Sequence, residues 1–364
     1  MFNNIYRGKK VWLSGHTGFK GAWLAEWLIS LGAEVRGYAL APDNTQLLFG
    51  ELQLDKRTDS QFLDINSAED VKKSILEFNP DFVFHLAAQP LVRLSYEIPR
   101  QTIATNVLGT VHVLDALRFL KKNCVTVIVT SDKCYENLET GHPHEEGDRM
   151  GGSDPYSASK GMAELVVTTY RRSFFGEKSL IKIASGRAGN VIGGGDMAAD
   201  RIVPDIIRSY YAQQSVGVRN PSSTRPWQHV LEPLSGYLWL GATMAHPELV
   251  AQPLSFATDF NFGPNPEAVR TVDDLVSQFK LVWPDLKVIK GPAGPHEAAK
   301  LSLSIEKAIK VLKWSPVWNF EKTIKKTAGW YSSRAQNHEV GQLCKNDIQE
   351  YFSDAQQMGC LWTR

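Results

Sequence analysis

Three evenly spaced glycines constrain this chain more than any other feature of the sequence. Gly15, Gly18 and Gly21 follow an apolar run at 11–13, and large apolar residues then recur at helical spacing up to Gly32, a C-cap. Glycine lacks a Cβ, so such a turn can be tight and its backbone can lie close to a pyrophosphate. The first N–H groups of the following helix then face that anion. The stretch predicts the start of a dinucleotide-binding unit, and the alternative is an ordinary glycine-rich turn.

Composition and charge narrow the class of protein. The 364 residues are 43% hydrophobic, enough for a large core, and the formal net charge is +1, so we expect no nucleic-acid or membrane partner. No apolar run approaches the roughly 20 residues that span a bilayer, and no signal-peptide core follows the basic N-terminus. The four cysteines lack metal-binding spacing, so we expect a cytoplasmic protein with reduced thiols and no metal site.

Strand-like and helix-like segments alternate along the first half of the chain, which predicts an α/β fold with a Rossmann-type, doubly wound parallel sheet. After the first unit we expect strands at 34–38, 81–88, 125–130 and 180–184, and helices at 67–78, 101–122 and from 153 onward.

The alternation ends after Val191, where glycine- and proline-rich loops begin. We expect one more strand at 254–262 that returns to the sheet, and later helices at 271–283, 304–313 and 319–334. The dinucleotide-binding domain is therefore assigned to 1–190, with a returning segment near 226–262. A smaller, discontinuous domain is assigned to 191–225 and 263–364.

Hydroxyl, carboxylate and ammonium groups gather around the strand at 125–130. Ser131, Asp132 and Lys133 follow it directly, at the edge where open parallel sheets place their chemistry. Tyr156 and Lys160 are four residues apart, which puts both side chains on one face of a helix. An ammonium beside a phenol favours the phenolate, so Tyr156 can serve as a base near neutral pH. The pair alone arises often by chance, but with the glycine turn and Ser131 it predicts a catalytic site.

The turn SGHTGFKG resembles the fingerprint of the extended short-chain dehydrogenase/reductase family. The segments TSDKCYEN, DPYSASK, SGRAGNVIGGGD and RPWQHV carry the resemblance over most of the chain, to the nucleotide-sugar 4,6-dehydratases of that family. Epimerases of the family need no acid and base after the strand, whereas dehydratases remove water from C5 and C6 of the sugar. The related dTDP-glucose enzymes carry Glu where this chain has Lys133.

The resemblance implies NAD as the cofactor. The residues that would bind it are Gly15, Thr17, Gly18, Phe19, Lys20, Gly21, Asp64, Ile65, Leu86, Ala87, Ala88, Gln89, Asn106, Tyr156 and Lys160. Asp64 would contact the adenine, but it could equally cap the helix that begins near Ser67. Asn106 could instead be a polar residue that faces a loop. The end of the second strand holds Gly37 or Tyr38 rather than an acidic residue, which leaves NAD and NADP less clearly separated.

The resemblance also implies a nucleotide-sugar substrate, CDP-glucose, and a role in deoxysugar biosynthesis for O-antigen or lipopolysaccharide. Substrate-binding candidates are Asn190, Arg201, Arg219, Arg225, Asn265 and His296. Arginine's planar fork suits phosphate oxygens, although each of these arginines could instead be a solvated surface charge. His296 could be a structural hydrogen-bonding residue. A homo-oligomer, dimer or tetramer, is implied as well.

The mechanism implied by the resemblance has three steps. Tyr156 takes the proton of the 4-hydroxyl, which Ser131 holds, as hydride leaves C4 for NAD. Lys133 then removes the C5 proton while Asp132 protonates the departing C6 hydroxyl, although the two roles could be reversed. The hydride returns to C6 and gives CDP-4-keto-6-deoxyglucose. Two alternatives are a 4-epimerase that uses the same Tyr156 and Lys160, and a non-catalytic dinucleotide-binding regulator.

Overall fold

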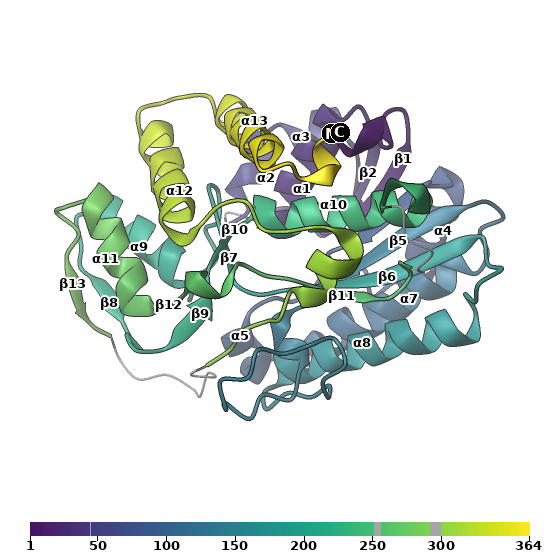
Figure 1. Cartoon of the computed structure of the whole chain (residues 1–364), viewed down its shortest axis with the longest axis horizontal. Helices are drawn as coiled ribbons and strands as arrows, with labels where there is room; N and C mark the ends of the chain where they lie inside the picture. Colours follow the sequence, from purple (N-terminus) through teal and green to yellow (C-terminus); the bar gives the residue numbers. More distant parts are fainter. Residues whose placement is uncertain (44, 251–255, 292–299) are drawn as a thin grey trace.

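A parallel sheet of seven strands forms the centre of the computed structural model, which describes residues 1–43, 45–250, 256–291 and 300–364 (Figure 1). The strand order is β3–β2–β1–β4–β5–β6–β11, and every neighbouring pair is parallel. The expected Rossmann-type fold is confirmed. The strands are β1 Lys10–Ser14, β2 Glu34–Ala39, β3 Asp59–Phe62, β4 Phe82–His85, β5 Cys124–Val129, β6 Ile181–Ala188 and β11 Asp259–Phe262.

Both faces of the sheet are covered by helices because successive strand residues point to opposite sides. Val11 and Leu13 of β1 belong to one hydrophobic cluster, and Trp12 between them belongs to the other. The first cluster includes α1 (Phe19–Ser30) and α10 (Leu231–Ala245). The second cluster packs under α4 (Ala68–Phe78), α7 (Gly109–Leu117) and α8 (Pro155–Ser173). In Figure 1, α10 lies above the sheet and α8 below it.

The expected helix at 101–122 differs in the structure. It is a continuous rod of three parts: α6 (Pro99–Ile103), a π-helical turn (Ala104–Leu108) and α7, which ends at Leu117. Asn106 lies in the π-helical turn and is buried. A π-turn inside a helix is often found at functional sites. The side chain of Asn106 is hydrogen-bonded to Gln89 in the loop after β4, so the alternative expectation, a polar residue that faces a loop, agrees with its position.

The second strand is found where it was expected and extends one residue further. β2 continues to Ala39, so Gly37 and Tyr38 are paired with Leu13 and Ser14 inside the sheet rather than standing at the strand end. A Cβ on Gly37 would lie 2.2 Å from Cδ2 of His16, so the histidine ring occupies the space over this glycine. The identity of residue 37 is therefore set by packing against His16.

Elements beyond β6 form a second group, seen on the left of Figure 1. It comprises β7 Val191–Ile192, α9 Ile202–Tyr211, β8 Val216–Val218, β9 Thr224–Pro226, β10 Gln228–His229, β12 Val269–Thr271, α11 Val272–Val282, β13 Val288–Lys290 and α12 Phe320–Ala335. The returning strand begins at Asp259, and residues 254 and 255 of the expected strand lie outside the described residues. Of the helix expected at 304–313, only a short segment with a π-helical turn at Ala308–Leu312 forms.

The C-terminal segment packs back on the N-terminus. Helix α13 (Val340–Gln357) lies against α1, and the rings of Phe2 and Trp362 stack with centroids 5.3 Å apart. The Asn3 N–H donates to the carbonyl of Arg364 at 2.8 Å, so the two ends of the chain are joined.

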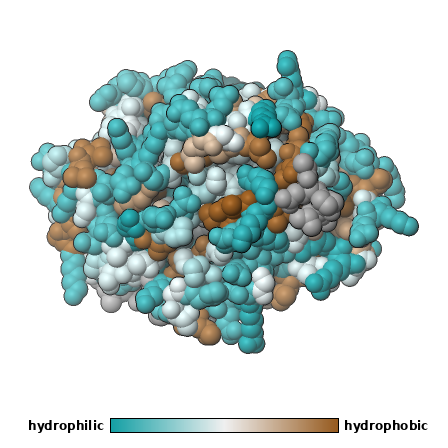
Figure 2. Space-filling view, in the orientation of Figure 1, coloured by the Kyte–Doolittle hydropathy of each residue, from teal (hydrophilic) through white to brown (hydrophobic). Residues whose placement is uncertain are grey.

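The outer face of the molecule shown in Figure 2 is mostly hydrophilic, with hydrophobic residues in small separate groups. Across the described part of the chain, none of the helices combines the length and apolar character that crossing a bilayer requires.

The remaining short helices connect the larger elements. They are α2 Leu47–Glu51, α3 Leu54–Arg57 and α5 Val92–Glu97, with 3-10 turns at Phe2–Asn4, Asp132–Cys134, Pro247–Val250, Pro266–Ala268 and Leu361–Thr363.

Candidate active site

The glycine turn joins β1 to α1 in a very close-packed arrangement. Gly15 has φ +75°, and a Cβ there would lie 2.8 Å from the backbone nitrogen of Ala87. A Cβ on Gly21 would lie 2.0 Å from the Gly15 carbonyl oxygen, whereas one on Gly18 would approach that oxygen only to 3.4 Å. Gly15 and Gly21 thus permit the tight turn. Gly18 is the N-cap of α1 and has no side chain to satisfy the first N–H groups, which remain available to an anion.

The loop after β4 is held against this turn. Ser14 Oγ accepts hydrogen bonds from the N–H groups of Leu86 and Ala87, at 3.0 and 3.1 Å. Asn106 binds the next part of the loop through two hydrogen bonds. Its Oδ1 accepts from the Gln89 N–H at 2.8 Å, and its Nδ2 donates to the Gln89 carbonyl at 3.1 Å. Nδ2 also donates to Ser159 Oγ at 2.8 Å. Asn106 therefore ties the loop to α8, next to Tyr156.

The predicted cofactor residues near β3 are more exposed. Asp64 is exposed, and its carboxylate accepts from the Asn66 N–H at 2.9 Å. The helix α4 is capped by Ser67 rather than by Asp64, which answers the alternative raised by the sequence. Ile65 is buried, and its carbonyl contacts His112. Thr17 Oγ1 donates to the carbonyl of Leu40 just after β2, at 3.4 Å.

Ser131, Asp132 and Lys133 lie at the carboxyl end of β5, where the chain enters a short 3-10 turn capped by Ser131. Ser131 Oγ donates to Asp132 Oδ1 at 2.9 Å. Lys133 Nζ lies 3.5 Å from the same oxygen and 3.4 Å from Asn190 Oδ1. The second oxygen of Asp132 is buried without a hydrogen-bond partner among the described residues, and it faces Gly189. A buried, unsatisfied carboxylate oxygen is costly unless a ligand group meets it.

Tyr156 and Lys160 occupy one face of α8 near its start, as the spacing predicts. Lys160 Nζ lies 5.9 Å from the centre of the Tyr156 ring. Burial raises the pKa of Tyr156 to about 12, while a hydrogen bond with Ser131 and the charge of Arg201 act in the opposite direction. Burial also lowers the pKa of Lys160 to about 8. The phenolate expected beside an ammonium is therefore not favoured, because desolvation outweighs the Ser131 hydrogen bond and the charge of Arg201.

Lys20 brings the glycine turn into the same site. It stands in the first turn of α1, and burial together with the cationic side chains of Arg201, Lys160 and Lys133 lowers its pKa to about 7, with Asp132 opposing. These charges are contributed by separate elements, so α1, β5, α8 and the segment before α9 meet at one edge of the sheet. An excess of positive charge at a helix N-terminus suits a phosphate ligand.

The substrate candidates are only partly brought together. Arg201 pairs with Asp196 at 3.0 Å, and Arg219 pairs with Asp200 at 3.3 Å. Arg225 is buried on β9 and donates to the Thr224 carbonyl at 2.8 Å. The next residue on that strand, Pro226, reaches Gly189 beside Asp132. Asn265 is exposed before a short 3-10 turn, and His296 lies outside the described residues.

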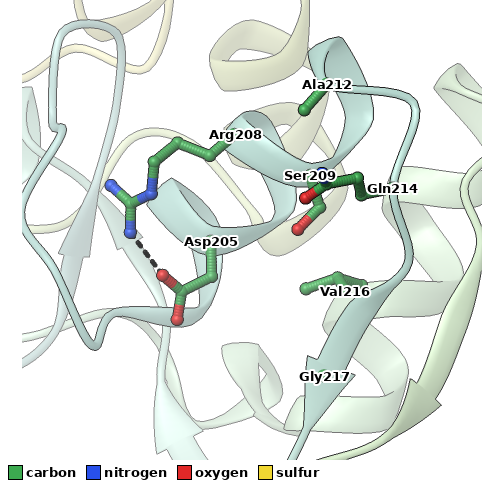
Figure 3. Close-up of a pocket in the computed structure, with 7 residues that line it drawn as sticks. All are labelled: Asp205, Arg208, Ser209, Ala212, Gln214, Val216 and Gly217. Atoms are coloured by element: carbon green, nitrogen blue, oxygen red, sulfur yellow. Dashed lines mark hydrogen bonds and ion pairs between the residues drawn. The ribbon is translucent and has the colours of Figure 1, made fainter.

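A separate cavity of about 360 Å³ opens in the second group of elements (Figure 3). It is lined from α9 and β8 by Asp205, Arg208, Ser209, Ala212, Gln214, Val216 and Gly217. Figure 3 shows the Arg208 guanidinium paired with the Asp205 carboxylate. The lining includes neither Ser131 nor Tyr156, so this cavity is distinct from the cluster around Ser131.

Two residues that the sequence did not single out support the site. His16 is buried in the glycine turn, bonded to Ser60 at 2.9 Å, and burial lowers its pKa to about 4. Glu164 lies one turn after Lys160, is paired with Arg187 at 2.7 Å and accepts from Ser185 Oγ at 2.8 Å. Its charge opposes the lowering of the Lys160 pKa. The continued spacing of four, from Tyr156 through Lys160, could have pointed to Glu164.

Comparison with known proteins places the chain among nucleotide-sugar enzymes. A family model described as GDP-mannose 4,6 dehydratase matches residues 13–327. The CDP-glucose 4,6-dehydratase of Salmonella typhimurium is 44% identical over 356 residues, which cover 96% of this chain and 98% of that protein.

Solved structures of lower identity share the fold. The UDP-glucose 4-epimerase of Thermotoga maritima, solved with UDP-glucose, gives a TM-score of 0.76 at 19% identity, covering 90% of this chain and 99% of the other. The UDP-glucuronic acid 4-epimerase of Bacillus cereus, solved with UDP-glucuronic acid and NAD, gives 0.75 at 18%, covering 89% and 99%. Within the described ranges, no cluster of His, Cys, Asp and Glu could hold a metal ion.

Proposed function

The chain belongs to the GDP-mannose 4,6-dehydratase family, and from this premise we propose that it is an NAD-dependent dehydratase that converts CDP-glucose to CDP-4-keto-6-deoxyglucose. The observation that carries the proposal is the 44% identity, over nearly the full length of both chains, with an enzyme of that name. The acid and base pair after β5, Asp132 and Lys133, supports the same assignment.

The residues present fit NAD. The close approach of Gly15 and Gly21 to neighbouring backbone leaves no room for side chains, while Gly18 leaves the start of α1 uncovered. Together with Lys20, this forms a cradle for a pyrophosphate. The loop held by Ser14 and Asn106 would carry the nicotinamide side, and Asp64 and Ile65 the adenine side. When bound, NAD supplies the acceptor and later the donor of a hydride.

We assign the proton transfers to the cluster at the sheet edge. Tyr156 removes the proton of the sugar 4-hydroxyl, and Ser131 holds that hydroxyl. Lys133 takes the C5 proton, and Asp132 delivers a proton to the departing C6 oxygen, which leaves as water. The product then requires a proton at C5 when hydride is added to C6. The buried, unpartnered oxygen of Asp132 is placed to meet such a group. The other oxygen, Oδ1, accepts a hydrogen bond from Ser131 Oγ at 2.9 Å, which fixes the orientation of the carboxyl group.

The nucleotide sugar would lie across the second group of elements. Arg201, Arg219 and Arg225, with Asn190, Asn265 and His296, are the residues we propose for it. In this assignment, 1–190 with the segment near 226–262 binds NAD, while 191–225 and 263–364 complete the substrate site. Within 263–364, however, the helix α13 packs on α1 of the NAD-binding part.

We also propose a homo-oligomer in the cytoplasm. The exposed apolar side chains Ile103, Leu108, Met162 and Leu165 lie on the adjoining segments of α6, the π-helical turn and α8, and a second copy could cover them. All four cysteines are buried and free, which suits a reducing compartment. Size-exclusion chromatography with light scattering tests the oligomer, and a monomer at micromolar concentration would contradict it.

The test of the proposed function is product formation. Purified protein with NAD and CDP-glucose should yield a 4-keto-6-deoxy sugar, detected by NMR. UDP-, dTDP- and GDP-sugars serve as matched substrates. Conversion of CDP-glucose to its 4-epimer would favour the epimerase alternative, and no conversion of any nucleotide sugar would favour a non-catalytic dinucleotide-binding protein.

A further inference from the structure

Two arginines from separate parts of the fold converge on one carboxylate. Arg93 of α5 approaches Asp200 with 3.2 Å between its Nη1 and Oδ1, and Nη1 of Arg219, just after β8, lies 3.3 Å from the same oxygen. Asp200 lies just before α9. The contact thus links the helical cover of the sheet to the second group of elements.

The bridge stands beside the candidate active site. Ser95, two residues after Arg93 on α5, accepts a hydrogen bond from the Tyr156 N–H at 3.2 Å. On the other side, Asp200 is followed directly by Arg201, whose charge acts on both Tyr156 and Lys20. The bridge therefore spans the edge of the sheet where the catalytic cluster lies.

Two guanidinium groups meet at one exposed carboxylate oxygen. The Asp200 side chain is 47% exposed, against 26% for Arg93 and 21% for Arg219. An exposed pair of this kind is weak and is easily exchanged for another anion. A diphosphate offers two negative charges and several oxygens, and arginine binds such groups through two parallel hydrogen bonds.

We propose that Arg93 is a substrate-binding residue that, together with Arg219, holds the diphosphate of the nucleotide sugar, and that Asp200 occupies this place only until the diphosphate displaces it. The inference rests on the proposed function, because it names a further residue for the same substrate. Arg219 keeps a second partner after the exchange, since its Nη2 lies 3.7 Å from Asp205, a residue drawn in Figure 3. The exchange needs only a movement of the Asp200 side chain.

Calorimetric titration of the full-length protein at saturating NAD tests the proposal, with CDP and cytidine as ligands. Arg93→Gln should weaken CDP binding roughly tenfold or more, because a charge-assisted hydrogen bond is lost. Cytidine, which has no phosphate, should bind as it does to the wild type. Asp200→Asn keeps the size and tolerates the left-handed backbone at this position, φ +61°. It should tighten CDP binding a few-fold, since a like charge is removed.

Arg118→Gln is the matched control. Arg118 pairs with Asp115 at the end of α7, at the opposite edge of the sheet, and its loss removes the same charge. It should leave CDP binding unchanged. The proposal is overturned if Arg93→Gln binds CDP within twofold of the wild type, if it weakens cytidine equally, or if Asp200→Asn weakens CDP binding.

The same titrations separate this inference from the proposed function. If the wild type prefers UDP or dTDP to CDP, the CDP-glucose assignment fails, and Arg93 must still show its effect on the preferred diphosphate. If the wild type binds no nucleoside diphosphate, both fail. Thermal unfolding of each variant verifies that the fold is retained.

Discussion

Replacing Gly21 with alanine tests the packing on which the cofactor cradle depends. The added Cβ would lie 2.0 Å from the Gly15 carbonyl oxygen, 2.7 Å from its carbon and 2.8 Å from the Cα of His16. All three atoms belong to backbone, so no flexible side chain can move aside. Overpacking typically costs ~1–3 kcal/mol, and this geometry places Gly21→Ala at the upper end, ~3 kcal/mol. In a protein of 364 residues that corresponds to a fall in Tm of roughly 4 °C.

Two matched glycine variants separate packing from cofactor approach. A Cβ on Gly18 meets the Gly15 oxygen only at 3.4 Å, so Gly18→Ala should keep the wild-type Tm but weaken NAD binding, because its methyl group would stand between the helix and the pyrophosphate. A Cβ on Gly50 in α2 meets nothing within 4 Å, so Gly50→Ala should neither lower Tm nor weaken NAD binding. Differential scanning calorimetry gives Tm, and titration gives the NAD Kd. A Gly21→Ala protein with wild-type Tm and NAD affinity would refute the reasoning.

Two further predictions concern catalysis and pH. Tyr156→Phe should lower turnover by ~10²–10⁴-fold, the usual loss of a general base, while Tm and NAD affinity stay unchanged; a folded variant with wild-type turnover would exclude Tyr156 as the base. Glu232, buried in α10, accepts from the Trp318 N–H at 2.6 Å and from Tyr351 at 2.7 Å, and burial raises its pKa from 4.5 to about 7. The folded state thus holds this proton more tightly, and the associated stability, up to ~3 kcal/mol, is present below about pH 4.5 and lost as pH rises through 7. Unfolding free energies of wild type and Glu232→Gln should diverge in favour of the variant between about pH 5 and pH 8, and a pH-independent difference would contradict the assignment.

The sequence predicted those parts of the fold that depend on local pattern. Glycine spacing and helical periodicity defined β1 and α1, and the β-branched run before Ser131 defined β5, because each signal lies within one segment. β2 was predicted to within one residue, and its last residue, Ala39, depends on pairing with Phe62 of β3. The π-helical turn at Asn106 has no local signature, because it follows from bonds to Gln89 and Ser159.

The site was predictable at the level of residue types at one sheet edge. Ser131, Asp132, Tyr156 and Lys160 could be placed there because parallel strands end together. The protonation states of these residues could not be predicted from the sequence, because the pKa of Tyr156 depends on burial by distant segments. Arg93 could not be identified from the sequence, because its partner Asp200 is remote in sequence and only the tertiary fold brings the two together.

Deuterium incorporation at C5 of the sugar tests the dehydratase assignment most directly. Wild-type protein, NAD and CDP-glucose in deuterated water should give a 4-keto-6-deoxy product with one deuterium at C5, because the proton removed there is replaced from solvent. Lys133→Met, similar in length but without the amine, should lose this product while still transferring hydride from C4, seen as bound NADH in a single turnover. A product without deuterium at C5, or a Lys133→Met variant that forms the deuterated product at the wild-type rate, would contradict the assignment of Lys133 as the base.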